Sequence, residues 1–494
     1  MGTLNLFAIP GDRGKFLLAV ITVLLTVSGC TLIPTYERPV PPVASQFPDV
    51  DSTQASASAA TSLGWAQFFG DARLRTLIAT AIDNNRDLLR ATRRVEEARA
   101  VYGIQRADQY PTIGADASVN RGRTPADLSF TGGAIVASQY QVALGLRAWE
   151  LDFWGRVRSL KQAALESFLA SDAARCAVRV SLVAQVASSY LFERELDERI
   201  AIAQQTFVSR QESYRYARRR YEVGSSSRLD AAQAEILLNQ ARSELTVLGR
   251  LRAQNRNALT LLVGTPIADS TAIPLSQVEA AFVREIAPGL PSDLLINRPD
   301  VRAAEHGLKA ANANIGAARA AYFPRIALTG AFGSASAELE GLFDAGSRAW
   351  NFLPSVSVPL FDGGRIQASH DLAQARRASA LAEYERTVQA AFREVADALA
   401  ERHWIYEQVA AQKSTLAAQI ERARLARLRY DSGAASYLEV LDAERDRFAA
   451  EQALVQVRRA LLASGVNLYA ALGGSVSAGD EDAKRTTPSG KLNP

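Results

Sequence analysis

The chain has 494 residues, of which 48% are hydrophobic, so it is long enough to build several buried cores. Its formal net charge is only +4 and its basic residues are spread along the chain, which excludes the concentrated positive patch of a nucleic-acid-binding protein. Two cysteines, Cys30 and Cys176, cannot supply a disulfide framework for a protein of this size.

The first thirty residues have the pattern of an export signal. Two basic residues precede a short apolar core at 16–26, which is too short to cross a bilayer as a permanent helix. The core ends at Val27-Ser28-Gly29-Cys30, the small-residue pattern of a lipoprotein cleavage site. We therefore expect residues 1–29 to be a lipoprotein signal peptide and Cys30 to carry covalent lipid, including palmitate; ordinary cleavage nearby is the alternative. Thr31, in place of aspartate, favours the outer membrane.

Two segments of biased composition flank the folded part. Residues 30–62 are rich in Pro, Ser and Ala and predict an extended, lipidated N-terminal tether. Residues 474–494 are rich in Ser, Gly and charges and predict a disordered tail, to which we assign no role. Between them no segment approaches the roughly 20 consecutive apolar residues of a membrane helix, so we expect any further membrane crossing to use a β-barrel.

The folded part repeats itself. Residues 84–111 align without gaps on 297–324, and a second block from Leu151 to Gly264 aligns on Leu360 to Gly473. Alanine-rich helices that aligned by composition alone would not place matched prolines and glycines at the breaks. The sequence therefore predicts two large structural repeats, at 63–264 and 292–473, separated by an equatorial insertion at 265–291.

Each repeat contains two segments in which apolar and polar or small residues alternate. This period of two predicts strands at about 112–121 and 140–151, and at about 325–333 and 352–361. Each strand is long enough to cross a bilayer when tilted, but four strands cannot close a barrel, so several chains would have to share one. Pro354 and Pro359 predict a short or irregular last strand. The paired strands would be joined by long loops at about 122–138 and 334–351.

Long helices follow the strands in both repeats. Helices are predicted at 155–222 and 364–430 because neither segment contains an internal proline or glycine beyond its first residue, and each would be roughly 100 Å long. Glycine-containing turns precede return helices at 228–263 and 436–472. One further helix in each repeat, at 71–109 and at 292–322, would complete an interrupted arm. Such lengths normally require coiled-coil-like partners.

Several motifs identify a known family. The chain resembles the TolC-type outer-membrane efflux channels, specifically their lipoprotein branch, over residues 64–473. The motifs that carry the resemblance are Cys30 with Pro34-Thr35-Tyr36-Glu37-Arg38-Pro39, Trp65-Ala66-Gln67-Phe68-Phe69-Gly70-Asp71, Leu151-Asp152-Phe153-Trp154-Gly155-Arg156-Val157, Asn297-Arg298-Pro299-Asp300, Tyr322-Phe323-Pro324 and Pro359-Leu360-Phe361-Asp362-Gly363-Gly364-Arg365.

The resemblance implies a mainly α fold with a small membrane β-barrel. In such a homotrimer a 12-stranded β-barrel is continued by a 12-helix α-barrel through the periplasm. The chain would be the passive exit duct of a tripartite multidrug efflux system, with a periplasmic adaptor, an inner-membrane pump and outer-membrane lipids as partners. It would be neither an enzyme nor a nucleic-acid-binding protein, and would need no cofactor apart from the lipid on Cys30.

The same resemblance implies two kinds of site. Leu438 and Asp442 match the positions that narrow the pore, Leu438 as an apolar constriction and Asp442 as a cation-attracting ring. The alternative is that Leu438 is coiled-coil core and Asp442 an exposed helical charge. The turns at Gly224-Ser225 and Gly433-Ala434 would contact the adaptor, although glycine at a turn is also explained by positive φ alone.

Other classes of protein are less consistent with the sequence. An enzyme is disfavoured because the three histidines, His306, His370 and His403, lack metal-ligand spacing and no glycine loop could cradle a phosphate. A lipid-anchored periplasmic scaffold would explain the signal and the helices but not the alternating segments. Within the channel class, an outlet for type I protein secretion is the nearer alternative.

Overall fold

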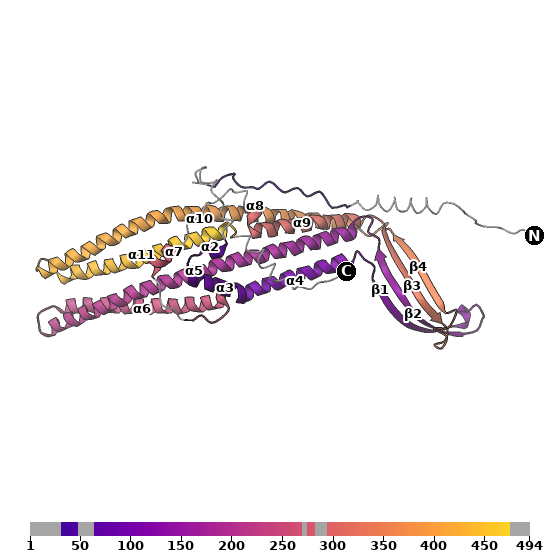
Figure 1. Cartoon of the computed structure of the whole chain (residues 1–494), viewed down its shortest axis with the longest axis horizontal. Helices are drawn as coiled ribbons and strands as arrows, with labels where there is room; N and C mark the ends of the chain where they lie inside the picture. Colours follow the sequence, from indigo (N-terminus) through magenta and orange to yellow (C-terminus); the bar gives the residue numbers. More distant parts are fainter. Residues whose placement is uncertain (1–30, 48–63, 269–273, 282–293, 475–494) are drawn as a thin grey trace, which may run out of the picture. The chain divides into compact units, whose positions relative to one another are not determined.

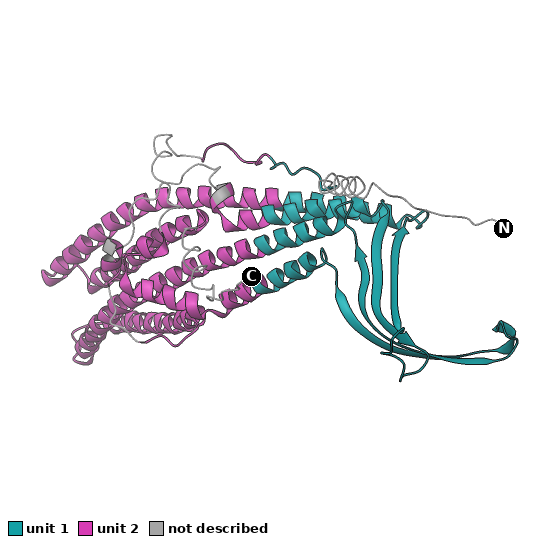
Figure 2. Cartoon of the chain, turned by 45° about the vertical axis from the view of Figure 1, so that its right-hand side comes forward, with its two compact units in different colours: residues 1–39, 96–170, 305–383 teal, residues 40–95, 171–304, 384–494 magenta. Residues whose placement is uncertain are grey.

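The computed structural model describes residues 31–47, 64–268, 274–281 and 294–474. The predicted signal peptide, Cys30 and the predicted tail beyond Gly474 lie outside these residues, as do parts of the predicted tether and insertion. The chain divides into two compact units, coloured separately in Figure 2. The first contains residues 1–39, 96–170 and 305–383, and the second contains 40–95, 171–304 and 384–494.

The first unit contains one antiparallel sheet with the strand order β1-β2-β3-β4 (Figure 1). Its strands are β1 (Ile113–Thr124), β2 (Ile135–Glu150), β3 (Arg325–Ser336) and β4 (Arg348–Ser357). They extend into the segments predicted as loops at 122–138 and 334–351, so those two predictions were too long. The pairing of Thr124 with Ile135 leaves a loop that includes the short helix η3 (Ala126–Leu128).

The last strand, predicted to be short or irregular at Pro354 and Pro359, is regular at Pro354 and ends at Ser357, before Pro359. β4 pairs continuously with β3, from Arg325 opposite Ser357 to Ser334 opposite Arg348. Pro354 is accommodated because β4 is an edge strand, where a residue without an N–H need not break a ladder. Pro359 lies beyond the strand. The irregularity is instead in β2, whose register shifts between Leu146 and Trp149.

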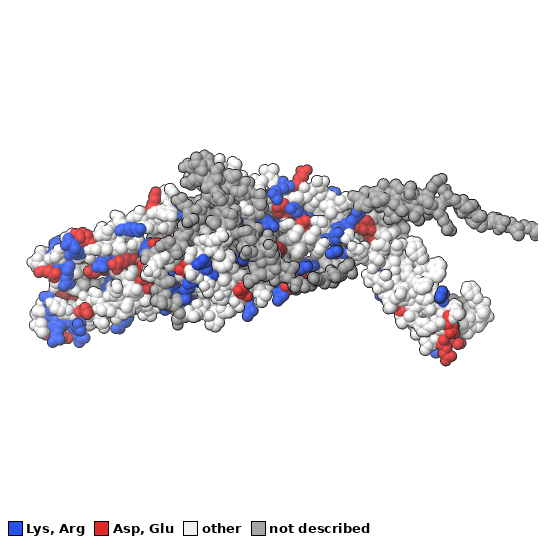
Figure 3. All heavy atoms as spheres, viewed as in Figure 1, with Lys and Arg blue, Asp and Glu red and all other residues white. Residues whose placement is uncertain are grey.

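The two faces of the sheet differ in chemistry. Leu144, Phe332 and Trp350 lie opposite one another on neighbouring strands, and all three side chains are exposed. The other face carries an ion pair between Asp116 and Arg147. In Figure 3 the visible surface of the strands is largely free of charged side chains. One face of the sheet is therefore an apolar surface that no described residue covers.

Aromatic stacking joins the strands to the helices in the first unit. Trp154 stacks on Phe323 with ring centroids 4.7 Å apart, and its indole Nε1 donates a hydrogen bond of 2.8 Å to the Pro324 carbonyl. Both repeats contribute to this junction, since Trp154 precedes α5 (Arg156–Glu222) and Phe323 follows α9 (Pro299–Ala320). The motifs quoted above at 151–157 and 322–324 therefore have a packing role.

The chain is mainly α-helical with a small sheet, which confirms the predicted fold class. Two helices, α5 (Arg156–Glu222) and α10 (Arg365–Asp431), have 67 residues each and are therefore about 100 Å long. Each is followed by a return helix, α6 (Arg228–Val263) and α11 (Tyr437–Ala471). The remaining helices are α2 (Trp65–Phe68), α3 (Ala72–Asn84), α4 (Arg86–Ala107), α7 (Leu275–Ala281), α8 (Leu294–Asn297) and α9 (Pro299–Ala320).

The segment 71–109, predicted as one helix, is broken at Asn85. This residue has an extended backbone with φ −64° and ψ 128°, and its side-chain oxygen accepts hydrogen bonds from the N–H groups of Asp87 and Leu88. Asn85 thus ends α3 and caps α4, as a short polar side chain can do for the first turn of a helix. Its amide also donates to the Leu262 carbonyl, which ties the break to α6.

The second unit has a hydrophobic core where α3, α5, α6, α7 and α11 meet. Phe69, Ile78, Tyr190 and Val466 are among its fully buried members. The Tyr190 hydroxyl bonds to Asp71 at 3.2 Å, and burial, aided by this carboxylate, raises the pKa of Tyr190. The motif at 65–71 is therefore part of a core that surrounds the buried carboxylate of Asp71, which has a hydrogen-bond partner in Tyr190.

Candidate functional site at the hairpin turns

The turns after α5 and α10 have the same backbone geometry. Gly224 has φ +76° and Gly433 has φ +74°, in the left-handed region that favours glycine. The Ser225 N–H donates to the Arg220 carbonyl and the Ala434 N–H to the Arg429 carbonyl, both at 2.8 Å. With the bonds from Gly224 to Tyr221 and from Gly433 to Tyr430, these contacts form a Schellman motif in each repeat.

The return helices begin differently in the two repeats. Ser227 and Asp230 form a capping box at the start of α6, with each side chain bonded to the other residue's backbone N–H. At the start of α11, Ser436 makes no side-chain cap, and Glu439 instead pairs with Arg429 at 3.0 Å. The start of α11 is therefore held by an ion pair, whereas the start of α6 is held by a capping box.

The two predicted constriction residues lie one helical turn apart on α11. Leu438 is 43% exposed and does not belong to the small core of Ala423, Ala426, Val440 and Ala443 that packs α11 on α10. The side chain of Asp442 is 40% exposed. The described single chain thus buries neither residue.

Asp442 is not an isolated carboxylate. Arg445 Nη1 lies 3.1 Å from Asp442 Oδ1, and Arg445 also pairs with Asp446 at 3.0 Å. Arg422 of α10 donates to Asp446 at 2.6 Å, and this bond lowers the pKa of Asp446. The Arg445 guanidinium therefore accompanies the Asp442 carboxylate. Sequence reasoning missed this pair, although Arg445 lies only three residues further along the helix.

A hydrogen bond links the two hairpins near their turns. Arg220 Nη1 donates to the Tyr430 hydroxyl at 2.7 Å, and the Tyr430 ring contacts Tyr437 with centroids 5.0 Å apart. Arg220 also lies over the Tyr216 ring. Sequence reasoning did not select Arg220 or Tyr430. The repeat alignment contained the signal, because Tyr430 corresponds to Tyr221 and both precede a turn glycine by three residues.

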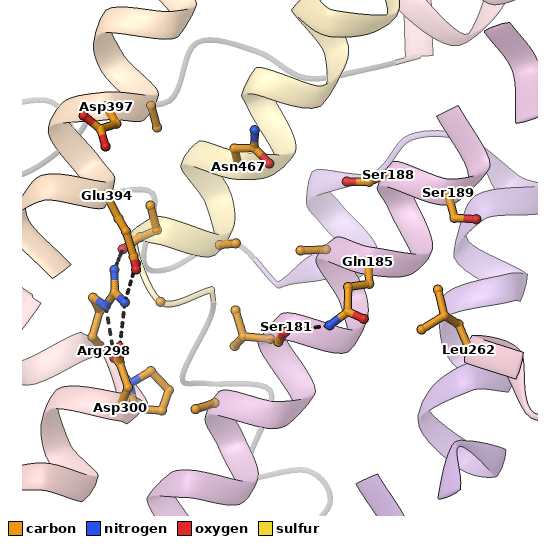
Figure 4. A pocket seen from close by; sticks show the side chains of 18 of the residues that line it. Ser181, Gln185, Ser188, Ser189, Leu262, Arg298, Asp300, Glu394, Asp397 and Asn467 are labelled. Carbon is orange, nitrogen blue, oxygen red and sulfur yellow. Dashed lines mark hydrogen bonds and ion pairs between the residues drawn. The ribbon is translucent and has the colours of Figure 1, made fainter. Parts of the chain in front are cut away.

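A groove of about 760 Å³ lies elsewhere in the second unit, between helices of the two repeats (Figure 4). At one end Arg298 bonds to Asp300, Glu394 and the Ala471 carbonyl. Burial opposes the charge of Arg298, but the two carboxylates outweigh it and raise its pKa. Ser181, Gln185 and Ser188 face the groove from α5. Arg298, from the motif at 297–300, thus ties the start of α9 to the end of α11.

No metal-binding cluster is found among the residues that the structure describes. No group of three or more potential ligands is close enough to hold a metal ion. His306 pairs with Glu166 at 2.7 Å and is partly buried. Over the same described segments, no helix is both long and apolar enough to cross a membrane.

Comparisons with known proteins agree with the geometry. The family described as "Outer membrane efflux protein" matches residues 77–265 and 290–474, which are the two repeats. Outer membrane protein OprJ of Pseudomonas aeruginosa is 45% identical over 94% of this chain and 96% of its own length. TtgC of Pseudomonas putida, described as a probable efflux pump outer membrane protein, is 44% identical over 93% and 96%.

A solved structure has the same fold. The open state of the Neisseria gonorrhoeae MtrE outer membrane channel superimposes with a TM-score of 0.82 and 40% sequence identity, covering 90% of this chain and 99% of MtrE. The similarity therefore includes both repeats, their long helices and the sheet.

Proposed function

The chain belongs to the outer membrane efflux protein family, and from this premise we propose that three copies form the outer-membrane exit duct of a tripartite efflux pump. This is the family that the sequence motifs predicted. The duct is a passive path for drugs or other small molecules, and carries out no chemical step. A periplasmic adaptor and an inner-membrane pump supply the substrate and the energy.

The observation that carries this proposal is the open sheet. β1 and β4 each pair with only one strand of the described chain, so each leaves one edge of backbone donors and acceptors without a ladder partner. Such edges are not tolerated in lipid, and the exposed row of Leu144, Phe332 and Trp350 favours a lipid environment. Three copies that join β1 to β4 of the next copy would close a twelve-stranded barrel and satisfy every edge.

The same trimer would place the hairpins around one pore. Leu438 and Asp442 are exposed in the single chain, which supports a position where side chains of three copies face a common axis. Leu438 would resist wetting and Asp442 would attract cations, with Arg445 reducing the field of each carboxylate. The hydrogen bond from Arg220 to Tyr430 would hold the two hairpins in the narrow arrangement.

The turns at Gly224-Ser225 and Gly433-Ala434 are proposed to contact the adaptor. All four residues are exposed, and their backbone groups are ordered by the Schellman motifs. The lipid on Cys30 is proposed to anchor each copy in the outer membrane, next to the described segment that begins at Thr31. Outer-membrane lipids and the adaptor are thus the two kinds of surface that the duct would contact.

Planar-bilayer conductance of the detergent-extracted mature protein tests both the duct and its constriction. We expect small, cation-selective openings from a heat-resistant trimer. Asp442→Ala should reduce the cation selectivity, whereas Arg445→Ala should increase it, because the second change removes the cation that lies 3.1 Å from the carboxylate. Gln233→Ala, at the equivalent position of the first repeat, is the matched control and should leave both the conductance and the cation selectivity unchanged.

The possible failures are separable. A monomer that stays in solution without detergent would contradict the duct altogether. A trimer that conducts ions but keeps the same selectivity in both variants would retain the duct and remove Asp442 from its narrowest part.

A further inference from the structure

The N-terminal segment Thr31–Arg38, called here the strap, is bound along the part of α9 that belongs to the first unit. The Asn312 side-chain amide donates to the Pro34 carbonyl at 2.7 Å, and Arg319 donates to the Leu32 carbonyl at 3.4 Å. Lys309 Nζ lies 5.1 Å from the centre of the Tyr36 ring. The strap therefore contacts one face of α9 over several turns, whereas its composition predicted a tether.

A buried carboxylate holds the C-terminal end of the strap. Glu305 is 5% exposed and accepts hydrogen bonds from Arg38 Nη2 at 2.9 Å and from the Tyr36 hydroxyl at 3.2 Å. Lys309 completes the site with an ion pair of 3.0 Å. Burying a carboxylate is costly without such partners, so removal of Arg38 would leave Glu305 with less compensation.

Close contact with the backbone of α9 holds the N-terminal end of the strap. A Cβ atom added to Gly316 would lie 2.6 Å from Ile33 Cγ1, 2.9 Å from the Ile33 nitrogen and 2.7 Å from Ser159 Oγ. Glycine is thus required at this turn of α9 for the strap to approach. Asn312, which is 2% exposed, is itself oriented by a hydrogen bond from Arg377.

The lengths of strap and helix match. Five residue steps from Ile33 to Arg38 cover about 16 Å at the rise of an extended, proline-containing segment. Eleven steps of α helix from Gly316 to Glu305 cover about the same distance. A strap that is one residue longer or shorter could not satisfy both ends, because Ile33 is set by Gly316 and Arg38 by Glu305.

The first repeat lacks this site. At the repeat offset of 213 residues, Glu305, Lys309 and Asn312 correspond to Thr92, Glu96 and Arg99. Gly103, the equivalent of Gly316, has open space where its Cβ would be. The two repeats therefore share the glycine but differ in the side chains that would bind a strap.

We infer that the strap is a docked spacer of fixed length, recognised by α9 of the second repeat alone, which determines where the N-terminal end of the mature chain leaves the body. It exits beside Arg319, the last turn of the helix before β3. One consequence rests on the proposed function: if Cys30 is acylated, the spacer holds the lipid of every copy at the level where its sheet begins.

Limited proteolysis of the full mature protein in detergent tests the spacer. Chymotrypsin cuts after Tyr36 only when the strap is released, so the rate, followed by intact mass, reports the released population. Gly316→Ala should raise this rate about tenfold or more, because its methyl group displaces Ile33. Gly103→Ala is the matched control: it brings the same gain in helix propensity and should leave the rate unchanged.

A second pair of variants covers the possibility that Gly316→Ala disturbs Ser159. Arg38→Ala and Glu305→Gln should each speed the cleavage, and the double variant should be no faster than the stronger single variant, because both act on one contact. A Gly-Ser pair inserted between Thr35 and Tyr36 should also release the strap, whereas the same pair inserted after Val40, an exposed residue, should not.

Equal cleavage rates in the wild type and all variants would overturn the inference, as would cleavage of the wild type at the rate of a free 31–40 peptide. Conductance of the same preparations separates this result from the duct. A protected strap in a protein that forms no channel supports the spacer and contradicts the proposed function. A wild-type protein that forms an ordinary channel but whose strap is already released supports the proposed function and contradicts the spacer.

Discussion

Arg220 of the first hairpin donates a hydrogen bond of 2.7 Å to the hydroxyl of Tyr430 in the second. Arg220 is held in place by the Tyr216 ring and by a bond to the Ser225 carbonyl, and Tyr430 is held by Tyr437. The contact joins the two repeats within one chain, next to the two glycine turns. In the proposed duct it would have to break, or move as a unit, when the pore widens.

Tyr430→Phe isolates this bond, because it removes the hydroxyl and keeps the ring against Tyr437. A hydrogen bond to a charged group contributes about 1.5–3 kcal/mol, so its loss should favour a wider arrangement. We expect a higher open probability and a larger mean conductance in planar bilayers. Tyr221→Phe, at the equivalent position of the first repeat, should behave as wild type. Equal conductance of both variants would show that the bond does not restrain the pore.

The exposed apolar row predicts that a charged substitution has different effects on the two faces of the sheet. Phe332→Arg places a charge in the row of Leu144, Phe332 and Trp350, and should cost about 2–4 kcal/mol if that row lies near the middle of the bilayer. Asn351→Arg adds the same charge to the opposite face, where Asn351 pairs with Ala331, and should be tolerated. The amount of heat-resistant protein in the outer-membrane fraction measures both. Equal insertion of the two variants would contradict a lipid-facing row.

Gly264 should tolerate substitution far less than another glycine of the same helix. It ends α6 with φ +78°, and an added Cβ would lie 2.5 Å from the Asn84 carbonyl oxygen. Gly264→Ala should therefore lower the unfolding free energy by about 1–3 kcal/mol. Gly249→Ala, within α6 and with open space around the new atom, should raise it by up to about 1 kcal/mol. Thermal unfolding in detergent distinguishes the two, and equal midpoints would contradict the close contact.

Release of the strap should depend on acid. Burial opposes the ionised form of Glu305, but the hydrogen bonds and charges of Lys309 and Arg38 outweigh it and lower the pKa of Glu305 below the ordinary value of 4.5. A carboxyl group with a lowered pKa stabilises the folded state above the ordinary value, and this contribution is lost as the pH falls towards the folded pKa. The protection of residues 31–38 from hydrogen exchange, relative to the intrinsic exchange rate at the same pH, should therefore fall below about pH 4.5.

The control for this acid effect is Glu305→Gln. The variant should already have a lower protection factor, which is the intrinsic exchange rate divided by the measured rate, at neutral pH. This factor should change little between pH 6 and pH 4, since the variant lacks the titrating group. An acid-induced release of the same size in wild type and variant would assign the effect to another carboxylate.

Much of the fold could be predicted because the information is local. Helices 155–222 and 228–263 were predicted to within one residue of α5 and α6, since missing prolines, turn glycines and a serine cap define a helix from its own residues. Strand lengths were predicted less well. How far β1 and β2 stay paired depends on cross-strand contacts, which alternation in one strand does not reveal.

The constriction site stays a prediction that rests on the resemblance. Leu438 and Asp442 were selected by resemblance, and the structure leaves both side chains exposed. The pairing of Asp442 with Arg445 could have been found from their spacing of three residues on a helix. The bond from Arg220 to Tyr430 joins residues 210 positions apart, and a sequence has no local signal for such a contact.

The sequence by itself determined the duplication, the long helices, the glycine turns and the family, because each depends on residue order or on backbone conformations that a few residues impose. Only the tertiary structure decided which residues far apart in the sequence pack against each other. Ile33 packs on Gly316 and Arg38 on Glu305 because the length of an extended strap equals that of three turns of helix, and that match exists only after both have folded.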